Sequence, residues 1–409
     1  MLRAVLILCA VAVWAGPAAA ADRPVQVAAL DSSRFMPSPD ALIAKTMEAI
    51  RASRLDEALK EVDRVIALRP DFKLAHLIKG DLLLARAKPL PTLGAASNRG
   101  SEQSLSDLRE EARVRLLSYL DQPNPNLLPK NILQLAAGQK YVLLADTSRS
   151  RLYLFENVEG EPRLLRDYYL TIGRNGTDKR IEGDKRTPIG AYTITSQLPQ
   201  KQLTDFYGTG AFPINYPNEW DQAQGRGGHG IWLHGTPPDT YNRAPRASDG
   251  CLVLTNPDLS EIGQWVKPGT PFVITDRVEW LDRQAWSEQR QKLIDKLAQW
   301  KGDWENRDAE RFLKHYASSF LQGQGRAWAE SKRRNLTDKD WIRVALSETS
   351  LYLYSGDDMA VASFQQDYAS DKLSDATRKR LYLKQENGDW RIVLEKAVDD
   401  EKRVAKLAR

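Results

Sequence analysis

The sequence has little of what metal sites, disulfides and membrane spans require. Its 409 residues include two cysteines, Cys9 and Cys251, and four histidines. It has no closely spaced cysteine pair and no His-Glu-x-x-His motif, the patterns that commonly supply zinc ligands. The apolar run near the N-terminus ends after about a dozen residues, whereas a spanning helix needs roughly 20. We therefore expect no metal site and no membrane-spanning helix in the mature chain.

Charge of one sign is also scarce. The formal net charge is +5, and Lys and Arg are interleaved with Asp and Glu instead of forming blocks. Nucleic-acid binding needs a concentrated basic face, so this distribution argues against such a partner, although a mild positive bias suits acidic targets. With 28% charged and 42% apolar residues, the composition is that of a globular protein with apolar cores. The length suggests about two or three domains.

The first 21 residues have the pattern of a secretion signal. Arg3 provides a positive start, residues 4–15 an apolar stretch, and residues 18–21 the small side chains that signal peptidase prefers. The alternative, a membrane anchor, is disfavoured because a Gly-Pro pair interrupts the apolar stretch. Cleavage would remove Cys9. It would leave Cys251 as the single thiol of an exported protein with no transmembrane anchor.

Residues 38–88 predict a helical hairpin, because apolar residues recur there at helical spacing and Leu68-Arg69-Pro70-Asp71 separates two helices. The segment weakly resembles a tetratricopeptide-type hairpin, and one such hairpin cannot bury its own apolar face. A helical cap on the next domain and a peptide-binding repeat both remain open. Residues 89–104, rich in Pro, Gly, Ser and Asn, predict a flexible linker, and residues 105–138 a helical connector.

Between residues 139 and 276 the pattern changes to short strands. Tyr141-Val-Leu-Leu-Ala, Gly190-Ala-Tyr-Thr-Ile-Thr and Gly230-Ile-Trp-Leu-His are alternating, aromatic and β-branched, and Gly, Pro and Asn clusters separate them. No long helices intervene, so this region predicts an all-β sandwich or a barrel-like core. The aromatic segment from Gly208 to Gln224 is a candidate lid or substrate wall, with an ordinary covered loop as the alternative.

The helical period returns after this region and is followed by further strands. Residues 277–294 predict a helical connector and residues 295–400 a helix-then-sheet domain. The order of its elements and its ending, Gly388-Asp-Trp-Arg-Ile-Val-Leu-Glu, resemble the SnoaL-like cone-shaped α+β fold. His315 stands among apolar helix residues, so a structural role is favoured. The whole chain therefore predicts a multidomain α+β protein.

Cys251 and His234 form the one constellation in the sequence that points to chemistry. A thiol nucleophile needs a base within reach, and His234 ends a predicted strand seventeen positions upstream of Cys251. His229 is a rival base. Residues an odd number apart point to opposite faces of a strand, so His229 and His234 cannot both face the thiol. Papain-like enzymes place the cysteine before the histidine, and that order excludes them here.

Taken together, His234-Gly-Thr, Ser248-x-Gly-Cys251 and the upstream Thr187-Pro-Ile-Gly-Ala-Tyr resemble the YkuD family of L,D-transpeptidases over about residues 141–275. The resemblance implies an all-β L,D-transpeptidase sandwich in the periplasm of a Gram-negative bacterium, acting on peptidoglycan stem peptides without a cofactor. It implies that Cys251 is the nucleophile, that His234 carries the proton, and that Ser248 and Gly250 are motif residues. Gly250 would allow close backbone approach, and Ser248 would orient the loop, contact substrate or simply occupy a turn.

We expect further residues around this motif to contact the substrate: Gly235, Asp249, Trp232 and Arg246. Two positions depart from the family pattern, since Asp249 replaces its usual histidine and Val253 its usual arginine. Asp249 beside the nucleophile would raise a thiol pKa unless its side chain points away. If the family arginine holds a substrate carboxylate, another must replace it or the substrate differs. The candidates are Arg174, Arg186, Arg243 and Arg246.

The expected activity is that of a cysteine-dependent L,D-transpeptidase. The resemblance implies a thioester formed at the L-centre of meso-diaminopimelate with loss of D-alanine. An amine then takes the acyl group in a 3,3 crosslink, a lipoprotein attachment or D-amino-acid exchange. One alternative is a carboxypeptidase or amidase of the same fold, in which water attacks. Another is a non-catalytic envelope scaffold, in which the hairpin and the SnoaL-like domain recruit an envelope protein partner.

Overall fold

The computed structural model describes residues 38–96, 101–241, 243–322, 324–354 and 358–398. The predicted secretion signal lies outside these residues. The chain divides into two compact units, of which unit 1 comprises Met1–Gln122 with Asp239–Ala244 and unit 2 comprises Pro123–Pro238 with Pro245–Arg409. Among the described residues, no helix combines the length and the apolar character needed to cross a bilayer.

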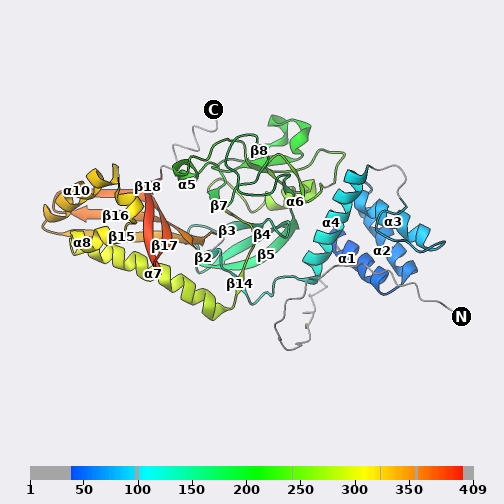
Figure 1. Cartoon of the computed structure of the whole chain (residues 1–409), viewed down its shortest axis with the longest axis horizontal. Coiled ribbons are helices and arrows are strands. Elements are labelled where there is room, and N and C mark those ends of the chain that lie inside the picture. Colours follow the sequence, from blue (N-terminus) through cyan, green and yellow to red (C-terminus); the bar gives the residue numbers. More distant parts are fainter. Residues whose placement is uncertain (1–37, 97–100, 242, 323, 355–357, 399–409) are drawn as a thin grey trace. The chain divides into compact units, whose positions relative to one another are not determined.

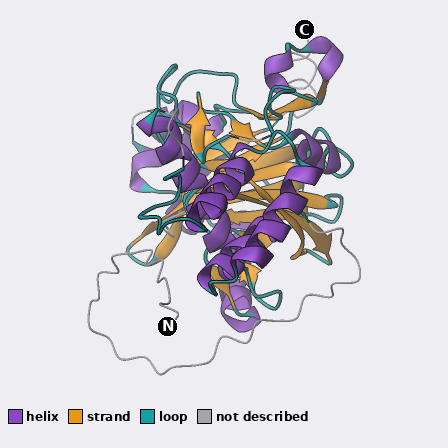
Figure 2. Ribbon diagram, turned by 90° about the vertical axis from the view of Figure 1, so that its right-hand side faces the viewer, coloured by secondary structure: helices purple, strands orange, loops and turns teal. Residues whose placement is uncertain are grey.

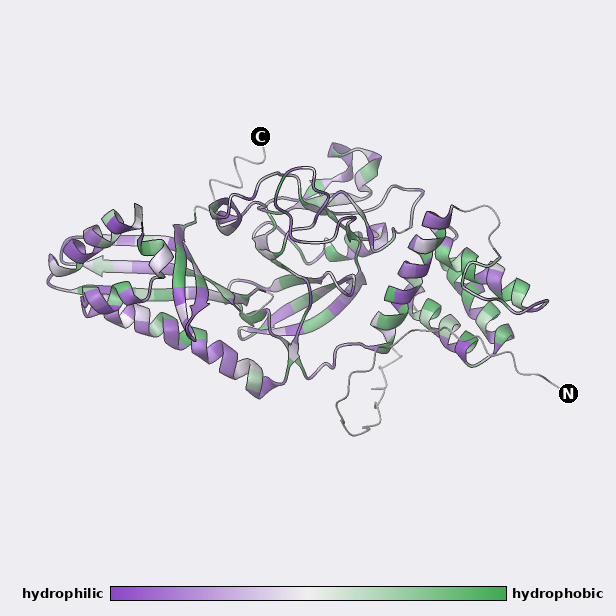
Figure 3. Cartoon of the chain, in the orientation of Figure 1, coloured by the Kyte–Doolittle hydropathy of each residue, from purple (hydrophilic) through white to green (hydrophobic). Residues whose placement is uncertain are grey.

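Unit 1 is built on helices (Figure 1). Their bounds are α1 Pro39–Arg51, α2 Leu55–Leu68, α3 Lys73–Ala85 and α4 Glu102–Leu120. The hydroxyls of Ser38 and Ser101 accept backbone N–H bonds at the starts of α1 and α4, which satisfies amides that a helix start leaves unpaired. Apolar faces of these helices meet in one core, and the hydropathy colouring in Figure 3 shows the alternation that produces them. The predicted break near Pro70 separates α2 from α3, and α1 and α4 help to close the core.

The predicted flexible linker does not hold for residues 89–96. The buried carboxylate of Asp81 accepts backbone N–H bonds from Gly94 and Ala96, and Arg109 donates to the carbonyl oxygen of Leu93 at 2.9 Å. Leu93 also packs against the core of unit 1. The composition of this segment predicts a linker, but composition does not show that the distant Asp81 carboxylate accepts hydrogen bonds from these backbone amides.

Unit 1 also contains a segment from much later in the chain, Asp239–Ala244, which lies between His234 and Cys251 in sequence. Tyr241 is buried in the core of unit 1. Its ring centroid lies 4.9 Å from that of Phe72, and the Arg69 guanidinium lies 5.2 Å from the Tyr241 centroid. No local pattern in the sequence predicted this contact, because a single aromatic residue carries no periodicity.

The first part of unit 2 is a sandwich of short strands. One sheet has the order β5-β4-β3-β13-β7 and the other the order β12-β10-β9-β8, with two-stranded sheets β11-β6 and β1-β14 beside them. Leu143 and Phe272 from the first sheet meet Leu233 and Leu252 from the second in one core. The strands are β1 Leu128–Pro129, β3 Tyr141–Asp146, β4 Arg151–Val158, β5 Glu161–Tyr169, β6 Ile172–Gly173, β7 Gly190–Thr193, β8 Leu198–Pro199, β9 Gly210–Pro213, β10 Trp232–His234, β11 Arg246–Ser248, β12 Leu252–Val253, β13 Pro271–Thr275 and β14 Trp280–Leu281.

Short helices connect some of these strands. They are η1 Gln200–Gln202, η2 Asp205–Tyr207, α5 Glu219–Ala223 and α6 Asn256–Ile262. The segment from Gly208 to Gln224, predicted as a candidate lid, instead forms β9, which pairs with β10, and the short helix α5. The segment is part of the sandwich because β9 belongs to the β12-β10-β9-β8 sheet.

The second part of unit 2 packs helices on an antiparallel sheet of order β18-β17-β16-β15-β2. Its elements are β2 Ile132–Gln134, α7 Arg283–Glu305, α8 Ala309–Lys314, α9 Ser318–Leu321, α10 Gln324–Thr337, β15 Ile342–Leu353, β16 Met359–Ser370, β17 Ser374–Glu386 and β18 Asp389–Ala397. Trp286, Leu293 and Trp300 of α7 enter the same core as the sheet. Helices are purple and strands orange in Figure 2. His315 is buried and its Nε2 lies 2.8 Å from Asp303.

Neither predicted helical connector has the expected bounds. In the segment 105–138, helix α4 ends at Leu120, and β2 pairs with β15, so this stretch supplies an edge strand to the C-terminal sheet. In the segment 277–294, β14 comes first and α7 begins at Arg283. That helix belongs to the C-terminal core from its first turns, because Trp286 is fully buried there. Helical periodicity alone did not show which core each helix faces.

A buried ion pair joins the two parts of unit 2. The Glu219 carboxylate of α5 accepts from the Arg380 guanidinium at 2.7 Å and from the Tyr382 hydroxyl at 2.9 Å. The rings of Trp220 and Tyr382 stack with centroids 5.9 Å apart. A cavity of about 100 Å³ lies beside this pair and is lined by residues of both parts, including Tyr192 and Arg380. These contacts fix the sandwich against the C-terminal sheet.

We expect Arg380→Met to lower the free energy of unfolding by about 3 kcal/mol, because it leaves the Glu219 carboxylate buried without its cation. Urea unfolding measures this change. Combining it with Glu219→Gln should recover part of the loss. Arg333→Met is the control, since Arg333 pairs with Glu310 on the surface and such pairs contribute less than about 1 kcal/mol. Equal losses for the two arginines would contradict the interpretation.

Candidate active site

Cys251 lies at the entrance to β12, directly after the turn that follows β11. It is a free thiol of intermediate exposure, and its Sγ donates to the carbonyl oxygen of Gly230 at 3.3 Å. A partly exposed thiol on a rigid strand end is placed to meet a substrate from solvent. The structure therefore puts the predicted nucleophile at the surface of the sandwich and not in its core.

His234 ends β10 and is almost fully buried. Its Nδ1 lies 2.7 Å from the carbonyl oxygen of Gly235. Because a carbonyl oxygen can only accept, Nδ1 carries the proton, and Nε2 is then the basic nitrogen of the neutral ring. This hydrogen bond fixes both the tautomer and the plane of the imidazole.

The pairing of β10 with β12 brings His234 close to the segment that carries Cys251. The strands are parallel, with Leu233 opposite Leu252 and His234 opposite Val253. Leu233 and Leu252 point into the sandwich core. Side chains alternate along a strand, so His234 and Val253 face the other way. Cys251 comes directly before β12, and its charge acts on Tyr207, whose ring centroid lies 5.1 Å from that of His234. The residues that the sequence singled out as thiol and base are thus neighbours in space.

The turn that carries Cys251 is held by internal hydrogen bonds. The Ser248 hydroxyl donates to the carbonyl oxygen of Cys251 at 2.6 Å and accepts from the backbone N–H of Gly250 at 3.2 Å. Gly250 has a φ of 122°, and a Cβ there would stand 2.7 Å from the carbonyl oxygen of Arg186. Of the roles open to Ser248, the geometry favours orientation of the loop.

Thr187 is a residue of the site whose importance sequence reasoning missed. It is fully buried, and its hydroxyl donates to the carbonyl oxygen of Gly250 at 3.0 Å while accepting from the backbone N–H of Gly173 at 2.9 Å. Its hydroxyl therefore ties the nucleophile turn to β6. The signal available in the sequence was its place in the Thr-Pro-Ile-Gly motif.

Aromatic side chains line the site near the thiol. The ring centroid of Tyr207 lies 4.8 Å from that of Trp232 and 5.1 Å from that of His234, and Phe206 lies 5.8 Å from His234. Burial, together with negative charge on Cys251, raises the pKa of Tyr207. Trp232 was a predicted contact residue. Phe206 and Tyr207 come from η2, which directly precedes the segment from Gly208 to Gln224 that was predicted as a lid or substrate wall.

Gly235 lies behind His234 and has a packing role. A Cβ at Gly235 would overlap the side-chain oxygen of Asn256. That amide accepts from the backbone N–H of Thr236 at 3.2 Å and donates to the carbonyl oxygen of Thr236 at 2.8 Å. The glycine lets Asn256 hold the strand end that positions the His234 ring. Gly235 can have this packing role without contacting the substrate.

The charged residues predicted at the site are placed unequally. Asp249 is exposed, and its carboxylate pairs with Arg174 at 2.7 Å, so a cation offsets its charge beside the thiol. Arg246 is exposed at the start of β11. Val253, at the position of the family arginine, is buried next to His234 in the sheet. The Arg186 guanidinium donates to the carbonyl oxygen of Thr177 at 2.8 Å.

His229 lies outside β10, because that strand begins only at Trp232. The parity argument against His229 therefore does not apply, since it assumed a strand from Gly230. His229 is exposed, and its Nδ1 is 3.7 Å from the Glu182 carboxylate. Within the part of the chain that the structure describes, no group of three or more His, Cys, Asp or Glu side chains is placed to hold a metal ion.

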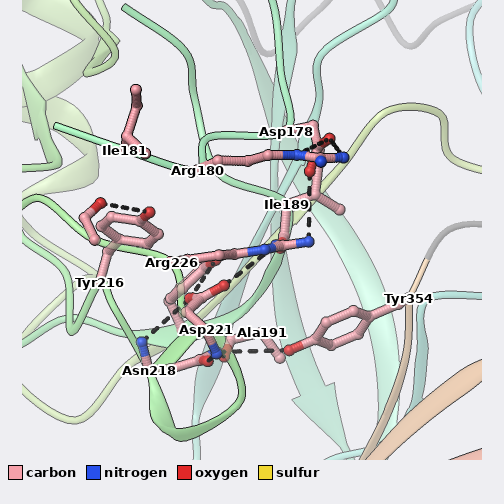
Figure 4. A network of polar contacts seen from close by, with 12 residues as sticks. Asp178, Arg180, Ile181, Ile189, Ala191, Tyr216, Asn218, Asp221, Arg226 and Tyr354 are labelled. Atoms are coloured by element: carbon pink, nitrogen blue, oxygen red, sulfur yellow. Dashed lines mark hydrogen bonds and ion pairs between the residues drawn. The ribbon is translucent and has the colours of Figure 1, made fainter. Parts of the chain in front are cut away.

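The loop from Arg174 to Thr187, which runs beneath the nucleophile turn, is fixed by carboxylates. Asp184 accepts from the Lys179 ammonium at 2.8 Å and from the backbone N–H of Arg180 at 2.8 Å. Burial alone would raise the pKa of Asp184, but these bonds outweigh it and lower the pKa to about 2. Figure 4 shows Arg226 between the Asp178 and Asp221 carboxylates, at 3.4 and 3.3 Å.

Thr187→Val should lower the free energy of unfolding by about 1–3 kcal/mol, because it leaves the Gly173 amide and the Gly250 carbonyl buried without their partner. Urea unfolding checks this. Thr377→Val in β17 is the matched control, since that hydroxyl bonds at the surface and the change should stay within about 0.5 kcal/mol. A value for Thr187→Val as small as the control would show that the hydroxyl does not hold the turn.

Asp184→Asn should cost stability at neutral pH but not in acid. The folded state lowers the pKa of Asp184, so the carboxylate stabilises the fold above its unfolded pKa of about 3.9 and loses that effect as pH falls toward 2. After allowance for solvent screening, we expect a difference from the wild type of about 1 kcal/mol at pH 7. Urea titrations at pH 7, 5 and 3 measure it. A difference that stays constant down to pH 3 would contradict this assignment.

Two known family models match the chain. Residues 140–274 match the YkuD L,D-transpeptidase catalytic domain, and residues 292–396 match the Cds6 C-terminal NTF2-like domain. Both confirm the resemblances expected from the sequence, since SnoaL-like and NTF2-like describe the same cone-shaped fold. No curated protein sequence matches the chain.

Two solved structures match about two thirds of the chain. Bd1075 of Bdellovibrio bacteriovorus is 28% identical with a TM-score of 0.59, and the match covers 66% of this chain and 98% of that one. The helical cell shape determining protein Pgp2 of Campylobacter jejuni is 24% identical with a TM-score of 0.55, covering 68% and 97%. At this level of identity, the similarity to Pgp2 shows a shared fold alone. The chain therefore contains a YkuD L,D-transpeptidase catalytic domain at residues 140–274, followed by an NTF2-like domain at residues 292–396.

Proposed function

We propose that this protein is an exported enzyme that forms a thioester between Cys251 and peptidoglycan stem peptides. The observation that carries the proposal is the placement of Cys251 directly before β12 and of His234 on the paired strand β10, with Tyr207 beside both, within a YkuD domain. A thiol with a tautomer-fixed imidazole on the neighbouring strand is what nucleophilic acyl transfer requires. The L,D-transpeptidase family acts on stem peptides, which supplies the substrate class.

In the first half-reaction, Nε2 of His234 takes the thiol proton and the thiolate of Cys251 attacks the carbonyl carbon at the L-centre of meso-diaminopimelate. The backbone N–H of Cys251 is the candidate donor to the oxyanion. The carbon–nitrogen bond to D-alanine then breaks, and His234 returns the proton to the leaving amine. The product is a thioester, and no oxidant or reductant is consumed.

The second half-reaction sets the outcome. If an amine attacks, the acyl group passes to it and forms a 3,3 crosslink, a lipoprotein attachment or an exchanged D-amino acid. If water attacks, the enzyme is an L,D-carboxypeptidase. We favour transfer, with hydrolysis as the second candidate because Asp249 and Val253 change the charges beside the thiol. A non-catalytic scaffold is the remaining alternative.

The location and biological role follow from the same proposal. The pattern of residues 1–21 supports export to the periplasm of a Gram-negative bacterium. The likeness to Pgp2, a protein that determines helical cell shape, supports a role in peptidoglycan remodelling and cell shape. Unit 1 and the NTF2-like domain are candidate contacts for an envelope protein partner.

Purified wild-type protein incubated with tetrapeptide muropeptides should release D-alanine, and mass spectrometry should show a crosslinked or exchanged product. Cys251→Ala should abolish release. His234→Gln should slow it about 100-fold or more, because it removes the proton carrier. Release of D-alanine with tripeptide as the sole product would select the carboxypeptidase. Identical behaviour of the wild type and Cys251→Ala would sink the enzymatic proposal and leave the scaffold.

A further inference from the structure

We propose that Arg174 is a specificity-determining residue of this site and that it binds the side-chain carboxylate of the diaminopimelate in the acyl donor. This inference deepens the proposed function and rests on it. Three features carry it: the backbone bond that fixes Arg174 to the nucleophile turn, the exposure of its guanidinium, and its position on the opposite side of Cys251 from His234.

The backbone of Arg174 is attached to the turn that presents the thiol. Its N–H donates to the carbonyl oxygen of Ser248 at 2.8 Å, and Gly173 is paired with Ser248 across β6 and β11. Ser248 in turn donates to the carbonyl oxygen of Cys251 at 2.6 Å. The Thr187 hydroxyl adds a second connection between Gly173 and the turn. Arg174 and Cys251 therefore keep a fixed spacing, as a residue that positions substrate must.

The strand order places Arg174 across the thiol from the base. Thr171 exchanges backbone hydrogen bonds with Val253 in an antiparallel bridge, while His234 pairs with Val253 from the other side. Beyond this isolated bridge, Gly173 pairs with Ser248 and the N–H of Arg174 bonds to the carbonyl oxygen of Ser248, so Arg174 lies beside the start of the nucleophile turn. β12, with Cys251 directly before it, thus lies between His234 on one flank and Arg174 on the other.

This arrangement selects which carboxylate Arg174 can receive. The leaving amine must lie on the His234 side, because that residue protonates it. The acyl half of the substrate then extends to the opposite flank, where Arg174 stands. For a stem peptide, that half carries two carboxylates: the α-carboxylate of D-glutamate and the carboxylate at the D-centre of the diaminopimelate side chain. The second belongs to the residue whose carbonyl is attacked, so it is the one we assign to Arg174. The carboxylate of the departing D-alanine lies on the other flank.

The guanidinium of Arg174 is available for such a contact. It pairs with Asp249 at 2.7 Å, and the two side chains are 49% and 69% exposed. One carboxylate oxygen uses a small part of a fork that has five N–H donors. Exposed ion pairs of this kind add little to stability, so a second carboxylate can share or displace Asp249 at low cost. Asp249 keeps the guanidinium beside the turn when no substrate is bound.

Other cations near the motif are less well placed. The guanidinium of Arg186 donates a hydrogen bond to the carbonyl oxygen of Thr177. Arg226 is held between Asp178 and Asp221. Arg243 belongs to unit 1. Arg246 starts β11, at the end of that strand away from the turn.

The test compares three acyl donors in wild-type protein, Arg174→Ala and Arg174→Lys. The donors are a stem tetrapeptide with meso-diaminopimelate, the same peptide with the side-chain carboxylate amidated, and the meso-diaminopimelate peptide ending in D-alaninamide. Arg174→Ala should lower kcat/KM about 10- to 100-fold for the first and third donors, mainly through KM, and leave the amidated donor nearly unchanged. Arg174→Lys should recover part of the loss, because it keeps the charge without the fork.

Arg163→Ala is the matched control, since Arg163 is an exposed arginine that pairs with Glu156 on the β4-β5 hairpin, and it should change none of the three rates. Equal losses with all donors would overturn the proposal by showing that Arg174 only supports the turn. No loss with any donor would also overturn it. A loss confined to the peptides with a free D-alanine carboxylate would assign Arg174 to the leaving group instead and equally reject it.

A binding measurement separates this inference from the enzymatic proposal. Calorimetry with Cys251→Ser, which cannot form the thioester, should show tighter binding of the diaminopimelate peptide than of its amidated form, and Arg174→Ala in that background should remove the preference. If this preference holds while the wild type releases no D-alanine, the recognition role survives and the catalytic proposal fails. If the two peptides bind alike, or neither binds, the recognition role fails.

Discussion

The parallel pairing of β10 with β12 is the constraint on which the candidate site depends. It sets His234 opposite Val253 and sends the leucines beside them into the sandwich core. Burial of those leucines fixes the register, because a slip of one residue would turn every side chain to the other face. The positions of thiol and base are therefore a consequence of core packing. The polar groups themselves need to contribute little energy to hold them.

Around this pair, buried hydrogen bonds hold a surface that must stay open to substrate. Ser248 and Thr187 satisfy the amides and carbonyls of the nucleophile turn from behind, while Asp184 and Arg226 fix the loop beneath it. The charged pair at the exposed edge, Arg174 with Asp249, is the least constrained part. Rigidity comes from the buried side and chemical selectivity from the exposed side, which lets a few positions alter the reaction without loosening the turn.

Local sequence patterns predicted the long and strongly periodic elements well. The helices α2 and α3 follow their apolar spacing, and β3 and β7 form where alternating runs predicted strands. The short strands β9, β11 and β12 were missed, as was the pairing of β2 with the C-terminal sheet. Two or three residues are too few to show a period. Their conformation is decided by the strand beside them.

The sequence alone determined that Cys251 and His234 belong together, because the spacing and glycines of their motif are local features. The departures from the family motif at Asp249 and Val253 were also visible in the sequence, but their effect on the charges of the site was not. Only the tertiary structure brings Arg174 beside Asp249, places Thr187 under the turn and puts Tyr241 in the core of unit 1. Each of these contacts joins residues far apart in the chain. Their distance is set by strand order and burial, which a linear pattern of residue types does not record.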